Sequence, residues 1–241
     1  MANFKVILNK CRTVFFDLEF YVPESSRKEV GFCYNPWDKK CKFLGGSFLT
    51  INPQKDFYLP DQAIKRKVNS LWLWDYESEQ ELLKNILDIL FPIVDLVKEA
   101  HQHRVSPLLC GIGITTSDVP ILFNLFSRFK LLSNQDAFAL QNSFRQIDLS
   151  QTAIGAFNNR DNWVYPKTKN EILNKHLKNK KFEDGRSVWD LYEHKDYEKI
   201  SNRVVDEVFS TFLCYKSIDN EYRSLRQLKE TSKKVENTVN K

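Results

Sequence analysis

The sequence is poor in the residues that mark fibrous, low-complexity and disulfide-rich proteins. Its 241 residues include only 7 glycines and 8 prolines, which excludes a collagen-like repeat and argues against a loop-dominated fold. The five cysteines are odd in number and form no Cys-x-x-Cys pair, so neither a zinc site nor a disulfide framework is expected. This cysteine usage favours a reducing compartment.

Long apolar segments are missing as well. The longest unbroken apolar run covers residues 89–94, far short of the roughly 20 residues that a transmembrane helix needs. The first ten residues show neither the apolar stretch nor the cleavage site of a signal peptide. We therefore expect a cytoplasmic globular protein, and an apolar content of 42% with 28% charged residues is typical of one. The net charge of +5 suits a polyanionic partner without requiring one.

Hydrophobic patterning predicts an α/β fold with helices on both faces of a sheet. Three antiparallel strands open the chain, an alternation of helices and strands follows, and the last third is helical. We expect one domain over residues 1–215 and a charged helix or tail over 216–241. The expected strands cover residues 12–20, 29–33, 42–51, 106–114 and 143–148, and the expected helices cover 79–103, 118–131, 149–157, 168–178, 187–193 and 197–215.

Acidic residues at three places carry the chemical signal. Asp17 and Glu19 alternate along the first strand, so both side chains point to the same face of the sheet. Two like charges on a buried strand are costly unless a cation lies between them, and hard cations such as Mg²⁺ prefer oxygen ligands. Asp118 opens a helix and Asp206 lies within one. Taken singly, each has an ordinary alternative: an edge strand facing solvent, a helix cap, or a solvated helix face.

As an ordered set, these motifs resemble the DEDD superfamily of 3′–5′ exonucleases, which have a ribonuclease-H-like fold. Phe16-Asp17-Leu18-Glu19-Phe20 resembles the first motif, Asp118-Val-Pro-Ile-Leu the second, and Asp206 on a late helix the third. Two further stretches resemble the polymerase-B-like exonuclease group. They are Gln146-Ile-Asp148-Leu, which ends a strand, and Gly185-Arg-Ser-Val-Trp-Asp-Leu-Tyr192, which precedes the third motif.

The resemblance implies a mixed five-stranded sheet and two-metal hydrolysis of phosphodiester bonds in single-stranded DNA or RNA. Two Mg²⁺ or Mn²⁺ ions, about 3.5–4 Å apart, would clamp the attacking and leaving oxygens. The resemblance assigns the metal ligands and their roles: Asp17 would bridge both ions, Glu19 and Asp206 would complete one site, and Asp118 would help hold the second ion.

One feature of that family is missing. Its members place a His five residues, or a Tyr four residues, before the third-motif Asp, and this residue orients the attacking water. Ser201 and Asn202 stand at those positions, and neither is a general base near neutral pH. His194 is the candidate substitute base, with an ordinary surface histidine as the alternative reading.

A basic cluster supplies a candidate nucleic-acid surface. Residues 167–181 hold six lysines against a single acid, Glu171. Such a surface would track a phosphate backbone, although a solvated helix face explains it equally well. The candidate contacts are Lys175, Lys178, Lys180 and Lys181, and the same cluster contains Lys167 and Lys169.

Three hypotheses follow from the sequence. The first is an active exonuclease on single-stranded nucleic acid. The second is a catalytically weak or inactive nuclease-fold module that binds nucleic acid or a protein partner, which the residues at Ser201 and Asn202 favour. The third is an unrelated α/β protein whose acids are surface residues.

Overall fold

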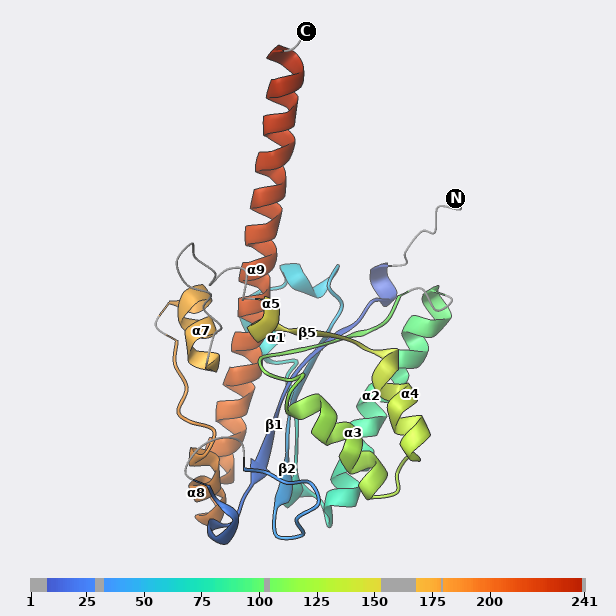
Figure 1. Cartoon of the computed structure of the whole chain (residues 1–241), viewed down its shortest axis with the longest axis vertical. Coiled ribbons are helices and arrows are strands. Elements are labelled where there is room, and N and C mark those ends of the chain that lie inside the picture. Colours follow the sequence, from blue (N-terminus) through green and yellow to red (C-terminus); the bar gives the residue numbers. More distant parts are fainter. Residues whose placement is uncertain (1–7, 29–32, 102–104, 153–167, 179, 240–241) are drawn as a thin grey trace.

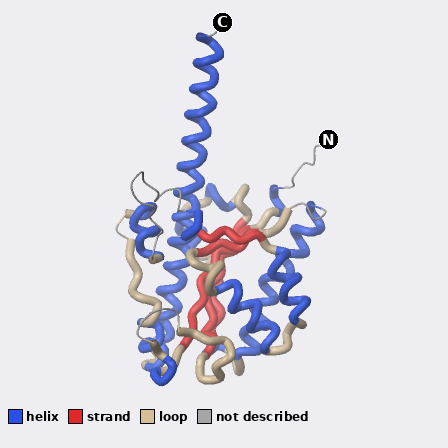
Figure 2. The backbone as a smooth tube through the Cα atoms, in the orientation of Figure 1, coloured by secondary structure: helices blue, strands red, loops and turns tan. Residues whose placement is uncertain are grey.

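A mixed five-stranded sheet lies between two layers of helices (Figures 1 and 2). The computed structural model describes residues 8–28, 33–101, 105–152, 168–178 and 180–239. This architecture confirms the predicted ribonuclease-H-like α/β fold. Within the described residues, no helix combines the length and the apolar character needed to cross a bilayer.

The sheet has the strand order β3-β2-β1-β4-β5, with β1 at its centre. β1 pairs antiparallel with β2 and parallel with β4, while β3 extends the antiparallel side and β5 the parallel side. The strands are β1 (Thr13–Tyr21), β2 (Lys42–Ile51), β3 (Asn69–Trp72), β4 (Leu108–Gly111) and β5 (Arg145–Asp148).

The third antiparallel strand differs from the prediction. It is β3, which comes from a segment whose sequence looked irregular, and it pairs with the end of β2 nearest the glycines Gly45 and Gly46. The strand expected over 29–33 falls on residues 29–32, which lie outside the described residues, and Cys33 lies in a loop.

The helices follow the predicted ranges with three differences. Two helices, α1 and α4, are additional, and α4 is capped by Ser133, whose hydroxyl accepts a hydrogen bond from the backbone N–H of Asp136. The helix expected over 149–157 is described only to residue 152, and α9 continues without a break through the expected boundary at 215. The α-helices are α1 (Asp61–Lys65), α2 (Glu79–His101), α3 (Asp118–Arg128), α4 (Asn134–Ser143), α5 (Leu149–Thr152), α7 (Lys169–Leu177), α8 (Ser187–Glu193) and α9 (Tyr197–Val239), and the 3-10 helices are η1 (Leu8–Lys10), η2 (Glu24–Ser26), η3 (Asp56–Tyr58) and η4 (Leu73–Asp75).

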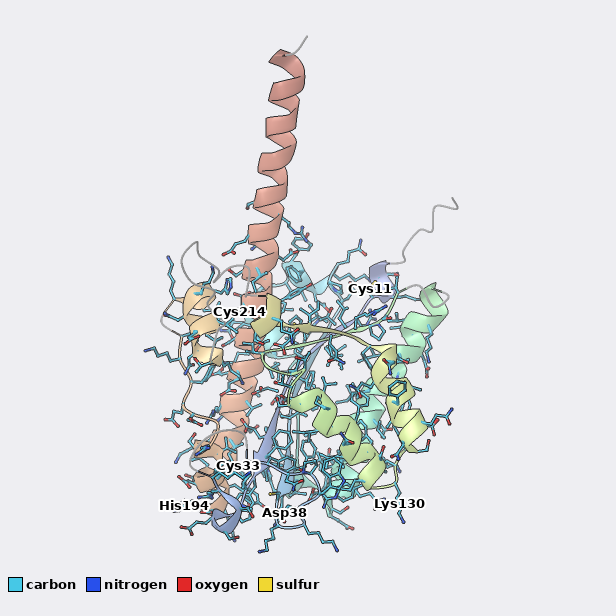
Figure 3. The ribbon with its side chains drawn as sticks, viewed as in Figure 1. Cys11, Cys33, Asp38, Lys130, His194 and Cys214 are labelled. Carbon is cyan, nitrogen blue, oxygen red and sulfur yellow. The ribbon has the colours of Figure 1, made fainter. Side chains whose placement is uncertain are left out.

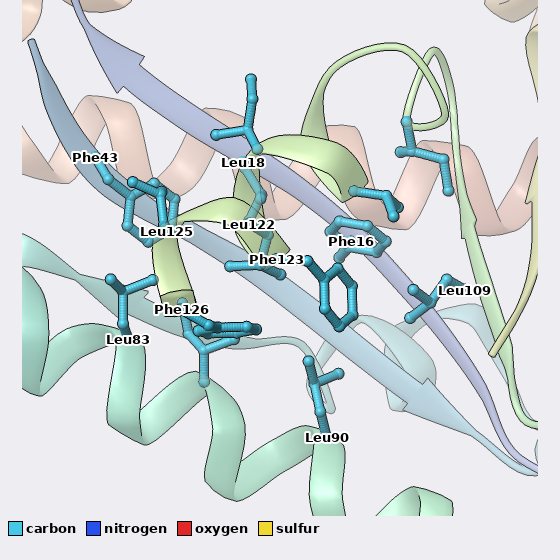
Figure 4. Close-up of a cluster of buried hydrophobic side chains, with 14 of the residues drawn as sticks. Phe16, Leu18, Phe43, Leu83, Leu90, Leu109, Leu122, Phe123, Leu125 and Phe126 are labelled. Carbon is cyan, nitrogen blue, oxygen red and sulfur yellow. The ribbon is translucent and has the colours of Figure 1, made fainter. Parts of the chain in front are cut away.

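The alternation of side chains along β1 divides the core into two layers. Phe16 and Leu18 face α2 and α3, where they join a cluster of buried aliphatic and aromatic residues (Figure 4). Phe15 faces the opposite way and packs edge-on against Phe212 of α9, with ring centroids 5.5 Å apart. Asp17 and Glu19 share the face of Phe15, as their spacing predicts. Both acids are therefore directed toward the layer that contains α7, α8 and α9 (Figure 1).

The register between β1 and β2 shifts next to the two acids. The irregularity lies between Glu19 and Phe20, and Gly45 is the residue paired with Glu19. Gly45 has φ +116°, and a Cβ atom there would lie 2.0 Å from the carbonyl oxygen of Leu71. Only glycine fits this position. A bulge of this kind re-aims the side chain beside it, here Glu19.

Candidate metal centre

The central strand extends beyond its parallel neighbour, and this exposes the acids to a cavity. β4 pairs only with Thr13 to Phe15 of β1. Asp17 and Glu19 therefore lie past the end of β4, at a place where open α/β sheets commonly hold ligands. Both residues are only 8% exposed.

Three carboxylates from distant parts of the chain converge there. Asp17 and Glu19 from β1 meet Glu207 from α9, and one oxygen from each lies within 4.8 Å of the others. All three residues are buried. An arrangement of this kind can hold a metal ion, because carboxylate oxygens are the ligands of hard divalent cations.

Asp206 does not belong to this cluster. Its carboxylate forms an ion pair with Lys65 of α1, and its side chain is 40% exposed. The buried face of α9 carries Ile200, Val204, Val208 and Phe212, four residues apart each time. Neighbouring residues of an α-helix point about 100° apart, so Glu207 shares this face while Asp206 turns away. The predicted place of Asp206 in the acidic cluster is therefore wrong, and the structure puts Glu207 there instead.

Asp118 lies beside the cluster but faces the strand. One of its carboxylate oxygens accepts a hydrogen bond of 3.1 Å from the backbone N–H of Leu18, and the other accepts one of 2.5 Å from the Ser117 hydroxyl. The Leu18 N–H needs this partner because β1 has run past the end of β4. Asp118 is 6% exposed and borders the same cavity. The structure thus brings three of the four predicted acids to one place.

Two cations lie against the carboxylates. The Lys169 ammonium is 2.8 and 2.9 Å from the two oxygens of Asp17 and 2.7 Å from Oε2 of Glu207. The Arg203 guanidinium is 2.8 Å from the other oxygen of Glu207. The sequence places Lys169 in the basic cluster of residues 167–181, but its side chain is directed into the acidic site. It is also the first residue of α7, a position where the helix dipole disfavours a cation.

Burial and charge divide the carboxylates into two protonation classes. Burial raises the pKa of Asp17 well above its ordinary value, although Lys169 opposes the shift. Burial, followed by the charge of Glu207, raises the pKa of Glu19 to about 8. Burial alone would also raise the pKa of Glu207, but the charge of Lys169, a hydrogen bond with Asp17 and the charge of Arg203 lower it to about 2. A metal ion bound here would therefore displace protons from the cluster.

Asp148 fixes the loop that leads to Asp118. It ends β5 and accepts hydrogen bonds from the backbone N–H groups of Gly113, Thr115 and Ser150 and from the hydroxyls of Thr115 and Ser150. Burial would raise the pKa of Asp148, but these hydrogen bonds outweigh it and the pKa is lowered. The strand-ending acid noted in the sequence is thus a structural anchor.

A cavity of about 640 Å³ opens in front of the acids. The stretch from Phe182 to Trp189, which contains the first half of the Gly185-to-Tyr192 motif, forms much of one wall. Two side chains hold this wall in place. The Asn170 side chain pairs with both backbone groups of Phe182 at 2.8 Å, and Arg203 donates to the carbonyls of Glu183 and Asp184.

The candidate base and the two family positions lie elsewhere. His194 ends α8, where its ring nitrogen Nδ1 lies 2.7 Å from the Asp190 carbonyl (Figure 3), and it does not border the cavity. Ser201 accepts a hydrogen bond from the Trp72 indole, and Asn202 is exposed. None of the three is placed to act on the carboxylate cluster.

The basic cluster is divided between surface and site. Lys175, Lys178 and Lys181 are exposed and Lys180 is half-buried. The Lys180 ammonium lies 4.9 Å from the ring centroid of Phe182, which borders the cavity. Lys167 falls outside the described residues.

Comparisons with known proteins add no family assignment. No protein-family model matches the chain, and no curated protein matches it in sequence. The resemblance to the exonucleases rests on the sequence motifs alone.

Proposed function

We propose that the protein is a metal-dependent 3′–5′ exonuclease that hydrolyses phosphodiester bonds of single-stranded nucleic acid. The observation that carries this proposal is the convergence of Asp17, Glu19 and Glu207 on one cavity. Structural carboxylates are rarely buried in threes, because like charges in a low-dielectric environment repel one another. A site for Mg²⁺ or Mn²⁺ accounts for the presence of three buried carboxylates at one place.

The charge of the substrate supports a metal at this place. A phosphodiester is an anion and would be repelled by ionised carboxylates, so a cation must separate the two. When bound, a divalent ion supplies a Lewis acid for the phosphate and an activated water molecule. The protein itself contributes Lys169, which bridges Asp17 and Glu207, and Arg203, and both cations favour the ionised form of Glu207.

The walls of the cavity suit a single strand. Phe182 lines it as a partly exposed aromatic ring on which a base can stack, and Arg186 adds a cation to the lining. The 3′–5′ direction is taken from the resemblance to the DEDD exonucleases. The product would be a nucleoside 5′-monophosphate.

A nuclease assay tests the proposal. Single-stranded DNA and RNA, labelled at the 5′ end, are incubated with the protein in Mg²⁺, in Mn²⁺ and in EDTA. We expect a ladder of shortened labelled products in either metal and intact substrate in EDTA. Asp17→Asn protein, purified in parallel, controls for contaminating nuclease. Intact substrates in both metals, or equal activity from the Asp17→Asn protein, would refute the proposal.

The second candidate function is a nuclease-fold module that binds without hydrolysis. Lys169 favours it, because an ammonium already neutralises Asp17 and Glu207 without a metal. The two functions differ in one measurement. A binding module retains labelled single strands on a filter in Mg²⁺ and leaves them uncut, whereas the exonuclease shortens them.

The exposed lysines after α7 are expected to track the phosphate backbone. Replacing both Lys178 and Lys181 with glutamine should lower the slope of log affinity against log salt by about 1.4, since each lost contact with a single strand removes about 0.7. The measurement is fluorescence anisotropy of a labelled oligonucleotide without divalent cations. Lys84→Gln with Lys98→Gln, on α2 across the sheet, is the matched control. Equal slopes for the two double variants would show that Lys178 and Lys181 do not contact the bound strand.

A further inference from the structure

Lys169 takes the geometric role that a second metal ion has in a two-metal site. Its ammonium contacts both oxygens of Asp17 and one oxygen of Glu207. Asp17 is the residue expected to bridge two ions. In the structure its two oxygens are instead bridged to Glu207 through Lys169 Nζ, so a cation of the protein already spans the cluster.

The backbone around Lys169 is fixed by neighbouring contacts. It is the first residue of α7, and the next residue, Asn170, pins the adjacent wall through its two hydrogen bonds to Phe182. The Lys169 side chain is 28% exposed, whereas its partners Asp17 and Glu207 are 11% and 2% exposed. A lysine held at two carboxylates by this framework is not a mobile surface side chain.

The formal charge of the site limits the number of ions it can take. Metal binding requires deprotonated carboxylates, and in that state Asp17, Glu19, Asp118 and Glu207 contribute four negative charges, while Lys169 and Arg203 contribute two positive charges. One divalent ion neutralises the remaining two negative charges. A second divalent ion would leave an excess of two positive charges in a buried site, which is costly without compensating anions.

Ligand geometry leads to the same number. Both oxygens of Glu207 accept bonds from cations, one from Lys169 and one from Arg203. Glu19 is the member of the cluster that stands next to the bulge and opposite Gly45. Glu19 and Asp17 could hold one ion while Lys169 keeps its contacts.

We propose that Lys169 is the built-in second cation of this site, so that the protein binds one divalent ion and places an ammonium where a second ion would otherwise lie. This inference rests on the proposed function, because it assigns the cations of the same site. The ammonium has three N–H donors and no acceptor. Its three carboxylate contacts, two with Asp17 and one with Glu207, match these three donors, so it holds the two side chains in place and acts as a positioning residue.

The test is the number of Mn²⁺ ions bound by the full chain, measured by titration calorimetry and by the loss of the free-Mn²⁺ electron paramagnetic resonance signal. We expect one ion per wild-type protein and two per Lys169→Met protein, because methionine keeps the length of the side chain and removes its charge. Lys175→Met, on the exposed side of the same helix, should still bind one ion. Lys169→Arg, which restores the charge, should also bind one.

Two results would overturn the inference. Two ions bound by the wild-type protein would mean that a second metal ion displaces the Lys169 ammonium. One ion bound by folded Lys169→Met would mean that Lys169 does not occupy the place of a second ion. If Lys169→Met fails to fold, as judged by circular dichroism, Lys169→Gln, which also removes the charge, is counted in its place, and one ion in that folded protein would likewise overturn the inference. Failure of the proposed function is seen separately, as uncut substrate in the nuclease assay, because ion counts do not depend on turnover.

Discussion

Replacing Glu207 with glutamine is expected to lower metal-dependent hydrolysis by about 10²- to 10³-fold, which corresponds to roughly 3–4 kcal/mol of barrier. Glu207 is 2% exposed and supplies one of the three converging carboxylates. Glutamine has the same shape but cannot carry the negative charge that binds a divalent ion. It also leaves Lys169 and Arg203 without the carboxylate that each now contacts.

The neighbouring residue provides the matched control. Asp206→Asn makes the same change of carboxylate to amide one position away, on the side of α9 that pairs with Lys65. That ion pair is partly exposed, so its loss should cost at most about 1 kcal/mol of stability, and hydrolysis should stay near the wild-type rate. The opposite outcome, with Asp206→Asn inactive and Glu207→Gln active, would show that α9 is rotated by one residue relative to this structure. Thermal melts of both variants separate loss of function from loss of fold.

Replacing Asp148 with alanine should have the largest effect on stability. The carboxylate accepts five hydrogen bonds from Gly113, Thr115 and Ser150. Removing it leaves partly buried donors without their partner, and we expect a loss of about 3 kcal/mol in the free energy of unfolding. Urea denaturation at pH 7 measures this. Asp88→Ala, exposed on α2, is the control and should change stability by less than about 0.5 kcal/mol.

The Asp148 contribution has a defined pH dependence. Its pKa in the folded protein is lowered from the ordinary value of 3.8, so the folded state binds a proton less readily than the unfolded chain. The stabilisation is therefore complete above pH values near 3.8 and is lost as the pH falls through the lower, folded-state pKa. The stability difference between wild type and Asp148→Ala should be constant from pH 7 to pH 5 and should shrink below about pH 4. A difference that grows with acid would contradict this assignment.

The sequence was sufficient for the architecture and for half of the candidate site. Period-two alternation placed Asp17 and Glu19 on one face of β1, because strand geometry is set by local backbone sterics. Strand and helix patterns likewise predicted the sheet and its flanking helices. The strand β3 was missed, since Asn69–Trp72 is short and its pairing with β2 depends on the close approach that Gly45 allows.

The sequence predicted Asp206 for the acidic cluster, although its own helical pattern indicates Glu207. Motif spacing favoured Asp206, whereas the apolar residues Ile200, Val204 and Val208 indicate which side of α9 is buried. Glu207 lies on that side. Helical periodicity decides which side chains of α9 can face the sheet. Where two acids are adjacent, as Asp206 and Glu207 are, it is a better guide than the spacing of motifs.

The role of Lys169 was decided only by the tertiary structure. In the sequence it is one lysine in a basic run, and no local pattern distinguishes it from Lys175. Its ammonium meets Asp17, 152 residues earlier, and Glu207, 38 residues later. Local sequence determines which way a side chain leaves its own strand or helix. Which charges then face one another across a cavity depends on how those elements pack, and at this site that packing placed a lysine among the acids.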